Sequence, residues 1–433
     1  MPLPVTMLDE SLLLLQETRA PWNVQFELGA DHRLDEAGLR QAVLFCCRRH
    51  PMARARLALS PQGETSYQWD IADEVDQDPL RVADCPDSAA LDQLRVELYT
   101  PPIALDTTPG FRIALARRAS GDLVLLSASH IVADGAGALR LMQTIARVCR
   151  GEPDPPDPLP LPQARDLGSF LAPKTRGEKW GRQLEGLRRI REALDPPSRI
   201  AVVGGTDHDG FGFVFRALDI GETTTPALVQ RASGTTVNDV LVAALHITVQ
   251  SWNAKHDVPT DRIGVQMPIN IRPADRLWDV VSNLTSMVSI STVPEDRADL
   301  ASAIAAVSEQ TCEMRRNDRA YGLFDNLEMV KKAPLAIKRA VPRLIQLSGD
   351  RFLDTVMLSN LGRIPEPPTF AAKPDSGPSE LWFSPPCDPS CSVAIGVATV
   401  GQRLSLVTRY RYEQFDADAA KEFTDLLIAQ VTR

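Results

Sequence analysis

LVLLSASHIVADGAGALRL, residues 123–141, is the stretch that decides how the chain is interpreted. Its first part, Leu123 to Ser127, is an unbroken apolar and β-prone run that predicts a buried strand. Its last part opens a segment from Gly135 to Val148 that predicts a helix with little polar surface. Between them lies the pattern His-x-x-x-Asp-Gly, from His130 to Gly135.

This pattern has two interpretations. A strand that ends at an imidazole, followed by Asp134 and by a glycine that lets the backbone turn sharply, would fix one ring nitrogen of His130 at the edge of a cavity, where it can act as a general base. In the simpler interpretation, His130 only ends a strand and Asp134 caps the next helix through its side-chain oxygen. The motif alone leaves both open.

Composition narrows the class of protein. A chain of 433 residues is too long for one ordinary core, so we expect two domains or two halves of one large fold. The net charge of −9, without a long Lys or Arg run, argues against nucleic acid as a partner.

Seven irregularly spaced cysteines and no secretory signal favour a cytoplasmic protein. No apolar run is long enough to span a membrane, so any membrane contact should be peripheral.

Proline marks the expected domain boundary. Residues 151–162 read GEPDPPDPLPLP, with six prolines and three acids, which predicts an extended spacer that does not pack. We therefore expect an N-terminal subdomain over residues 1–165 that carries His130, a linker over 166–198, and a C-terminal subdomain over 199–433. Cys387 and Cys391 stand four residues apart but lack a second Cys or His pair nearby, so we expect no metal site.

Hydrophobic periodicity predicts a mixture of helices and strands in both halves. The expected helices are Met7 to Gln16, Leu34 to His50, Ala89 to Tyr99, Gly135 to Val148, one from about Thr225, Thr235 to Val249, Ala298 to Arg315, Tyr321 to Leu347 and Ala417 to Val431. The expected strands are Trp22 to Leu28, Ala53 to Leu59, Thr65 to Ile71, Phe111 to Ala116, the Leu123 run, Ile200 to Val203, Phe211 to Leu218, Arg262 to Ile271, Val280 to Thr292, Val356 to Gly362, Ser392 to Val400 and Leu404 to Tyr410.

Two basic stretches have more than one interpretation. Lys174 to Arg191 can be a solvated helix face or a site for phosphate groups or an acidic partner. Tyr321 to Leu347 alternates basic and apolar residues. It can be an ordinary half-buried helix, or a surface for an anionic membrane, coenzyme A phosphates or an acidic carrier protein.

Several stretches together resemble one superfamily. The His130 motif resembles the active-site motif of the acyltransferases that include chloramphenicol acetyltransferase, peptide-synthetase condensation domains and bacterial wax ester synthase/diacylglycerol acyltransferases. TVNDVLVAAL, which contains Asn238, resembles a second signature of the last branch. VMLSNLG resembles the Ser359-Asn360 loop near the family's active site. Many members carry two consecutive histidines, and Ser129 stands where the first would be.

The resemblance implies an α/β (α+β) fold of mixed sheets in two chloramphenicol-acetyltransferase-like subdomains, arranged as a V around an active-site tunnel. It implies that His130 is the catalytic base and that Asp134 turns away from the substrate to pair with an arginine from the other half. Arg272 is our candidate for that partner, and Gly135 completes the structural set. Possible substrate or oxyanion contacts are Ser129, Asn238, Ser359 and Asn360.

The expected activity is an O-acyltransferase that moves an acyl group from a thioester, on coenzyme A or a carrier protein, to an alcohol. No metal or organic cofactor is expected, because a thioester already has a good leaving group. Two alternatives stay open, namely amide-forming condensation on carrier-bound substrates and a catalytically idle binding module of the same fold. Expected partners are a small-molecule donor and acceptor and an acyl carrier protein.

Overall fold

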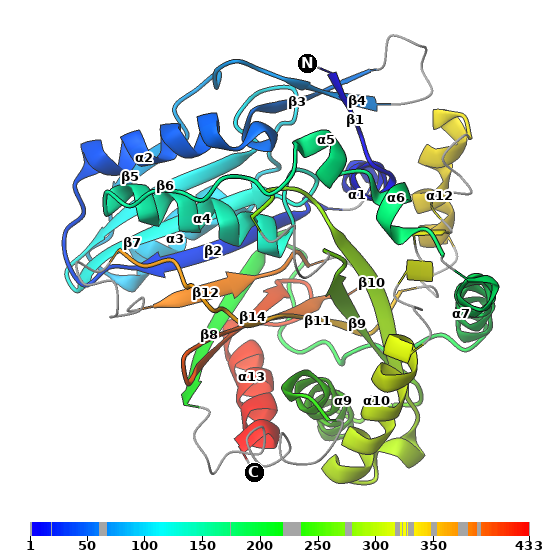
Figure 1. The fold of residues 1–433 in the computed structure, drawn as a ribbon. Coiled ribbons are helices and arrows are strands. Elements are labelled where there is room, and N and C mark those ends of the chain that lie inside the picture. Colours follow the sequence, from blue (N-terminus) through cyan, green and yellow to red (C-terminus); the bar gives the residue numbers. More distant parts are fainter. Residues whose placement is uncertain are drawn as a thin grey trace.

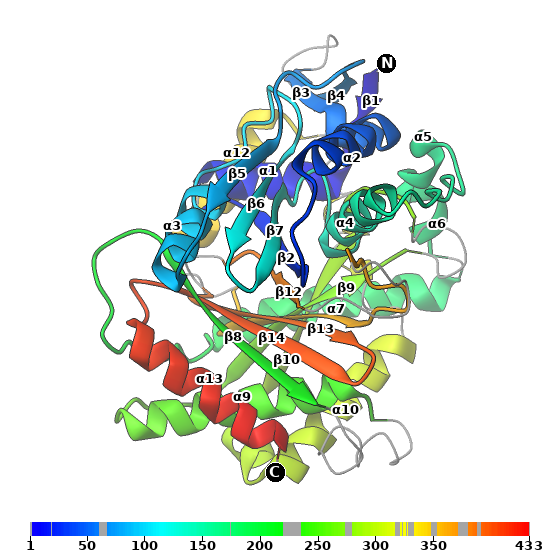
Figure 2. The same cartoon turned by 90° about the vertical axis from the view of Figure 1, so that its left-hand side faces the viewer.

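We describe a computed structural model of residues 2–18, 20–59, 67–173, 175–219, 235–272, 279–316, 321–322, 324–325, 327, 333–347, 353–370, 380–387 and 391–432. Two β-sheets, each with helices packed against it, form an upper and a lower lobe (Figures 1 and 2). The mixed α/β class expected from the sequence is confirmed.

The N-terminal lobe is built on a five-stranded sheet of order β12-β2-β7-β6-β5. Its strands are β2 (Asn23–Gly29), β5 (Leu80–Asp84), β6 (Phe111–Arg118), β7 (Gly121–Ser129) and β12 (Leu381–Ser384). Helices α2 (Glu36–Arg49) and α4 (Gly135–Cys149) share one apolar core with alternate residues of β2, β6 and β7. Helix α3 (Ser88–Tyr99) packs on the other face against the remaining residues of β6 and β7.

The C-terminal lobe contains a six-stranded sheet of order β10-β9-β11-β13-β14-β8. Its strands are β8 (Phe211–Asp219), β9 (Ile263–Asn270), β10 (Thr285–Thr292), β11 (Val356–Arg363), β13 (Val393–Val400) and β14 (Arg403–Arg411). Helices α9 (Val237–Lys255), α10 (Leu300–Arg316) and α13 (Ala417–Thr432) cover its lower face in Figure 1.

The smaller elements surround these sheets. Strands β1 (Pro2–Pro4), β4 (Tyr67–Ile71) and β3 (Ala55–Leu59) form a separate sheet. The other helices are α1 (Met7–Thr18), α5 (Leu161–Ala164), α6 (Leu167–Leu171), α7 (Arg176–Leu194) and α12 (Leu335–Leu347), with 3-10 turns at Pro51–Arg54 and Pro294–Arg297. In the described part of the chain, no helix is long and apolar enough to cross a bilayer.

Strand β12 connects the lobes, and the sequence did not predict it. Its four residues lie far along the chain, yet they pair antiparallel with β2, Leu381 opposite Leu28 and Ser384 opposite Gln25. The N-terminal sheet therefore includes a strand from beyond residue 199. The subdomain boundaries at 165 and 199 stay a prediction, and they assign this strand to the C-terminal subdomain.

Four local predictions were wrong or fall outside the described residues. Residues 200–203 form no strand and make a single bridge from Val203 to Phe415. The helix expected from about Thr225 lies outside the described residues. The helix expected over 321–347 is interrupted at Ala333 and Pro334, before α12 begins. The strand expected from Val280 begins only at Thr285, because backbone groups of residues 282 and 284 bond to Asp134 and Arg272 instead of a neighbouring strand.

The proline-rich segment packs against the N-terminal lobe, contrary to the prediction of an unpacked spacer. Asp154, whose side chain is 1% exposed, accepts hydrogen bonds from both terminal nitrogens of Arg140, at 2.7 Å each, and one from Thr144 at 3.0 Å. Arg49 and Arg147 lie within 4 Å of the same carboxylate. The segment packs because a buried carboxylate attaches it to α2 and α4, and because Leu159 and Leu161 contact apolar clusters.

Replacing Asp154 with alanine should lower the free energy of unfolding by about 3 kcal/mol, because Arg140, also 1% exposed, loses its one buried carboxylate partner among the described residues and keeps only the partly exposed Asp279. Chemical denaturation measures this. Asp157→Ala is the matched control, since its partly exposed pair with Arg49 should contribute less than about 1 kcal/mol. Equal losses in the two variants would contradict this account of the segment.

Candidate active site

His130 lies just after β7, where the N-terminal lobe faces the C-terminal one. Its backbone N–H donates to the oxygen of Trp22 at 2.8 Å, which continues the pairing of β7 with β2. The two rings meet edge to face, with centroids 6.4 Å apart. The residue is 5% exposed, and it lines a cavity between the lobes. The ring is therefore held by its neighbours and accessible to a small reactant.

The protonation state of His130 suits a base. Burial lowers the pKa of His130, because the charged imidazolium would lose its hydration, and the negative charge of Asp134 offsets this only in part. Its Nδ1 atom is buried and has no hydrogen-bond partner among the described residues, which leaves Nε2 as the nitrogen that can face the cavity. A neutral ring with an available Nε2 can accept a proton.

Asp134 holds the turn rather than the imidazole. One carboxylate oxygen caps α4 by accepting from the N–H of Gly137 at 2.8 Å. The other accepts from the Leu284 N–H at 2.8 Å, the Thr285 hydroxyl at 2.9 Å and Arg272 Nη1 at 2.6 Å. The same carboxylate therefore caps helix α4 and pairs with Arg272 of the other lobe.

The Asp134–Arg272 pair is completely desolvated, since neither side chain is exposed. Burial alone would raise the pKa of Asp134, but the charge of Arg272 and the hydrogen bonds it accepts hold that pKa below its ordinary value. Arg272 also donates to the backbone oxygens of Val280 and Ser282. The guanidinium thus ties the irregular segment before β10 to the turn after β7.

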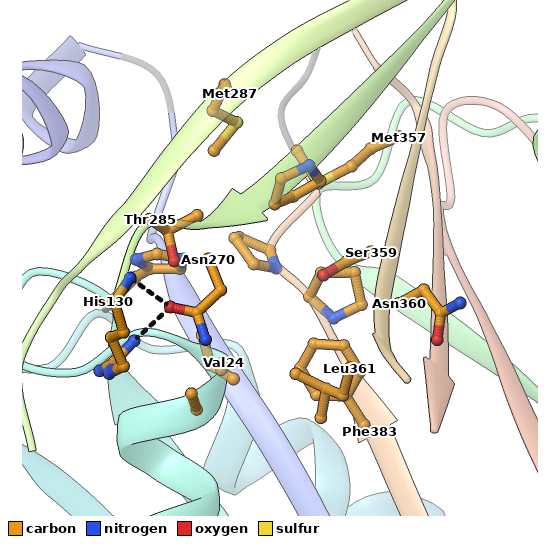
Figure 3. Close-up of a pocket in the computed structure, with 16 residues that line it drawn as sticks. Val24, His130, Asn270, Thr285, Met287, Met357, Ser359, Asn360, Leu361 and Phe383 are labelled. Carbon is orange, nitrogen blue, oxygen red and sulfur yellow. Dashed lines mark hydrogen bonds between the residues drawn. The ribbon is translucent and has the colours of Figure 1, made fainter. Parts of the chain in front are cut away.

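Asn270 is a site residue that the sequence analysis missed. Its side-chain oxygen accepts from the backbone N–H of Arg272 at 3.0 Å and from Arg272 Nη1 at 3.4 Å, the two dashed lines of Figure 3. These donors fix which end of the amide is oxygen, so Nδ2 is the end left to donate into the cavity. Its position two residues before Arg272, at the end of a strand, was a usable signal.

Both lobes line the cavity, which has a volume of about 80 Å³. His130, Asn270 and Thr285 lie on one side of it, and Ser359, Leu361 and Phe383 lie opposite (Figure 3). A space of this size accommodates reacting groups rather than a whole acyl chain. A second cavity of about 420 Å³, near the start of α9, shares Pro268, Asn270 and Asn360 with the first. Whether the two join into a tunnel stays a prediction.

Gly135 provides space rather than backbone freedom. It is absent from the residues with positive φ, so the expected sharp turn does not need its conformational range. A Cβ atom there would stand 3.0 Å from Leu361 and 3.4 Å from Phe383, inside the cavity lining. Glycine therefore lets the first turn of α4 approach the C-terminal lobe closely.

The structure separates the four candidate contact residues. Ser359 lines the cavity of His130. Asn360 points away from His130 (Figure 3) and donates to the side-chain oxygen of Asn238 at 3.3 Å, so its amide nitrogen is already engaged. Asn238 lines the second cavity. Ser129 is completely buried and lies outside the cavity lining, because it belongs to the strand, opposite Asn23.

The described residues contain no group of three or more His, Cys, Asp or Glu placed to hold a metal ion. The thiols of Cys387 and Cys391 donate to backbone oxygens, of Cys391 and Asp354 respectively, at 3.1 Å.

Two lobes that meet at a buried histidine, with the supporting arginine in the second lobe, define an acyltransferase-type arrangement. The condensation-domain family model matches residues 11–336, and the chain belongs to that family. Two curated Mycobacterium tuberculosis proteins, called uncharacterized proteins MT2362 and Rv2305, are each 34% identical over 408 residues, which cover 92% of this chain and 91% of theirs.

Solved structures support the fold. The first condensation domain of the calcium-dependent antibiotic synthetase matches with a TM-score of 0.73 at 15% identity, covering 100% of this chain and 95% of that one. The cyclization-docking bidomain of EpoB, a peptide synthetase from Sorangium cellulosum, matches with a TM-score of 0.68 at 18% identity, covering 99% and 83%. The expected two-subdomain fold is therefore confirmed.

Replacing Asp134 with alanine should lower the free energy of unfolding by about 3 to 5 kcal/mol, because it leaves Arg272 buried and unpaired. Lys255→Ala, which breaks an exposed pair with Glu422, is the control and should cost under about 1 kcal/mol.

The stabilisation that Asp134 provides should also depend on pH, because its folded-state pKa is depressed. This stabilisation is present above the unfolded carboxyl pKa of about 3.9 and is lost as pH falls through the folded value. Unchanged stability of Asp134→Ala would refute the architectural role.

The pH dependence of turnover should follow neutral His130. Its pKa lies below the ordinary 6.5, so kcat/KM for the acyl thioester, whose reacting group does not titrate near neutrality, should be flat from about pH 7 to 8 at saturating acceptor. The rate should fall only in acid, as the ring gains a proton. A pH–rate profile tests this, and an activity that begins to rise only above pH 7 would count against His130 as the base.

Proposed function

We propose that this chain catalyses acyl transfer from a carrier-bound thioester to an acceptor amine, with His130 as the general base. The observation that carries the proposal is a neutral imidazole that opens into a cavity lined by both lobes. The family match supports this carrier-dependent condensation, one of the alternatives drawn from the sequence, better than transfer from acyl coenzyme A to an alcohol.

The proposed step needs no group beyond the chain and its two substrates. The acceptor nitrogen attacks the thioester carbonyl carbon while Nε2 of His130 takes a proton from that nitrogen. The carbon–sulfur bond then breaks, and the proton passes to the leaving thiolate. The products are an amide and the carrier's free thiol. Positioned base catalysis of this kind typically contributes 10² to 10⁴-fold.

Asn270 is our candidate for the oxyanion contact. Arg272 holds its oxygen, so its amide nitrogen is oriented before any substrate arrives. A donor fixed in advance stabilises the developing negative charge without reorganising during the reaction. Asn360, the residue suggested by the sequence, is a weaker candidate because its amide donates to Asn238.

A product screen tests the proposal. The full chain is incubated with an acyl group on a phosphopantetheinylated carrier or on coenzyme A, each with amine or alcohol acceptors, and products are identified by mass spectrometry. Amide formed from the carrier-bound donor supports the proposal. Ester formed preferentially from acyl coenzyme A would favour the O-acyltransferase that the sequence analysis expects. The absence of any product would favour an idle binding module.

His130→Ala should reduce product formation by 10² to 10⁴-fold and leave the thermal unfolding midpoint within a few degrees of the parent's. His32→Ala is the matched control, since this histidine is partly exposed and paired with Asp31 away from the cavity. Near-full turnover by folded His130→Ala would overturn the assignment of the base.

A further inference from the structure

Helix α12 presents an apolar face to solvent and a charged side chain to the protein interior. Lys338 is 4% exposed and donates to both carboxylate oxygens of Glu10 on α1, at 2.8 and 3.1 Å. Leu335 and Pro342 are buried on the same side. At 100° per residue, Ile337, Leu344 and Leu347 lie on the opposite side, and Val341 lies at the edge of that side. This arrangement is the reverse of the usual surface helix.

The exposure of these four side chains is large. Ile337 is 58% exposed, Val341 43%, Leu344 62% and Leu347 82%. Among the described residues, thirteen large apolar side chains are exposed, of which these four lie on α12 and three more, Trp180, Leu184 and Leu194, lie on α7. Both helices lie at the same edge of the molecule, the right-hand edge of Figure 1. An apolar surface of this kind marks an interaction site.

Charge and composition indicate what binds there. The thirteen residues of α12 include no acid, in a chain whose net charge is −9. Arg343 is exposed along one edge of the apolar face, next to Arg339, whose side chain already pairs with Glu17 and donates to the Tyr67 hydroxyl. An apolar face bordered by arginines matches the pattern of helices that lie in a membrane interface. Trp180 on α7 is 67% exposed, and tryptophan is enriched at membrane–water interfaces. A purely electrostatic partner would need only the basic side chains, whereas this face also exposes four apolar side chains.

We propose that α12 is a peripheral docking helix for an anionic lipid bilayer. The four apolar side chains enter the boundary between headgroups and acyl chains, and Arg343 contacts the anionic headgroups. Since Lys338 and Leu335 seat the helix on the protein, docking needs no unfolding. This inference concerns a surface away from His130, and it does not depend on the proposed reaction.

Vesicle co-sedimentation tests the inference without any substrate. The full chain is mixed with vesicles of phosphatidylcholine containing phosphatidylglycerol, or of phosphatidylcholine alone, at low salt. We expect binding to the anionic vesicles that falls as salt is raised. The double variant Ile337→Gln/Leu344→Gln replaces two exposed apolar side chains with glutamine, which is a good helix former. It should weaken binding at least tenfold. Arg343→Gln should weaken it about fivefold.

Val202→Gln is the matched control, because Val202 is 63% exposed on an irregular segment outside both helices, and it should bind like the parent. Circular dichroism and the thermal midpoint show that each variant is folded. Failure to bind anionic vesicles, or binding that the double substitution leaves unchanged, would overturn the proposal. So would capture of an acidic carrier protein by the same face without vesicle binding.

Discussion

The buried ion pair between Asp134 and Arg272 is the interaction on which the site depends. It joins the turn after β7 to the segment before β10, and these belong to different lobes. Each partner is completely desolvated, so either charge alone would be costly to bury, and the lobes are held in the one arrangement that satisfies both. His130 lies four residues before Asp134 in the same turn, so the arrangement of the two lobes also sets its position. Strand β12 adds a second connection, through backbone hydrogen bonds rather than charge.

Sequence reasoning predicted the local structure around His130 because the signals there are local. A continuous apolar run, an Asp at a helix N-cap and the periodicity of α4 need no information from the rest of the chain. The condensation-domain family was among those that the resemblance named, whereas the wax ester synthase/diacylglycerol acyltransferase branch stays a prediction. The contact between Asp134 and Arg272 came from the resemblance alone, because nothing near either residue in the sequence indicates the other.

What the sequence could not predict depends on long-range contacts. Strand β12 is four residues long, too short for periodicity, and only its register with β2 makes it a strand. Residues 280–284 look like a strand and are irregular, because their backbone groups bond to Asp134 and Arg272. The need for Gly135 comes from Leu361 across the interface, more than two hundred residues away. Asp154 anchors a proline-rich segment whose composition gave no hint of burial.

A double-mutant cycle on Asp134 and Arg272 tests the central claim most directly. Asp134→Asn, Arg272→Gln and the double variant are compared with the parent for both the free energy of unfolding and the rate of acyl transfer. A coupled pair predicts that the double variant loses much less than the sum of the single losses, with an interaction energy of about 2 kcal/mol or more, and that turnover falls in parallel. Additive losses in stability, or full turnover in the single variants, would contradict the account, because the two lobes would then position His130 without this pair.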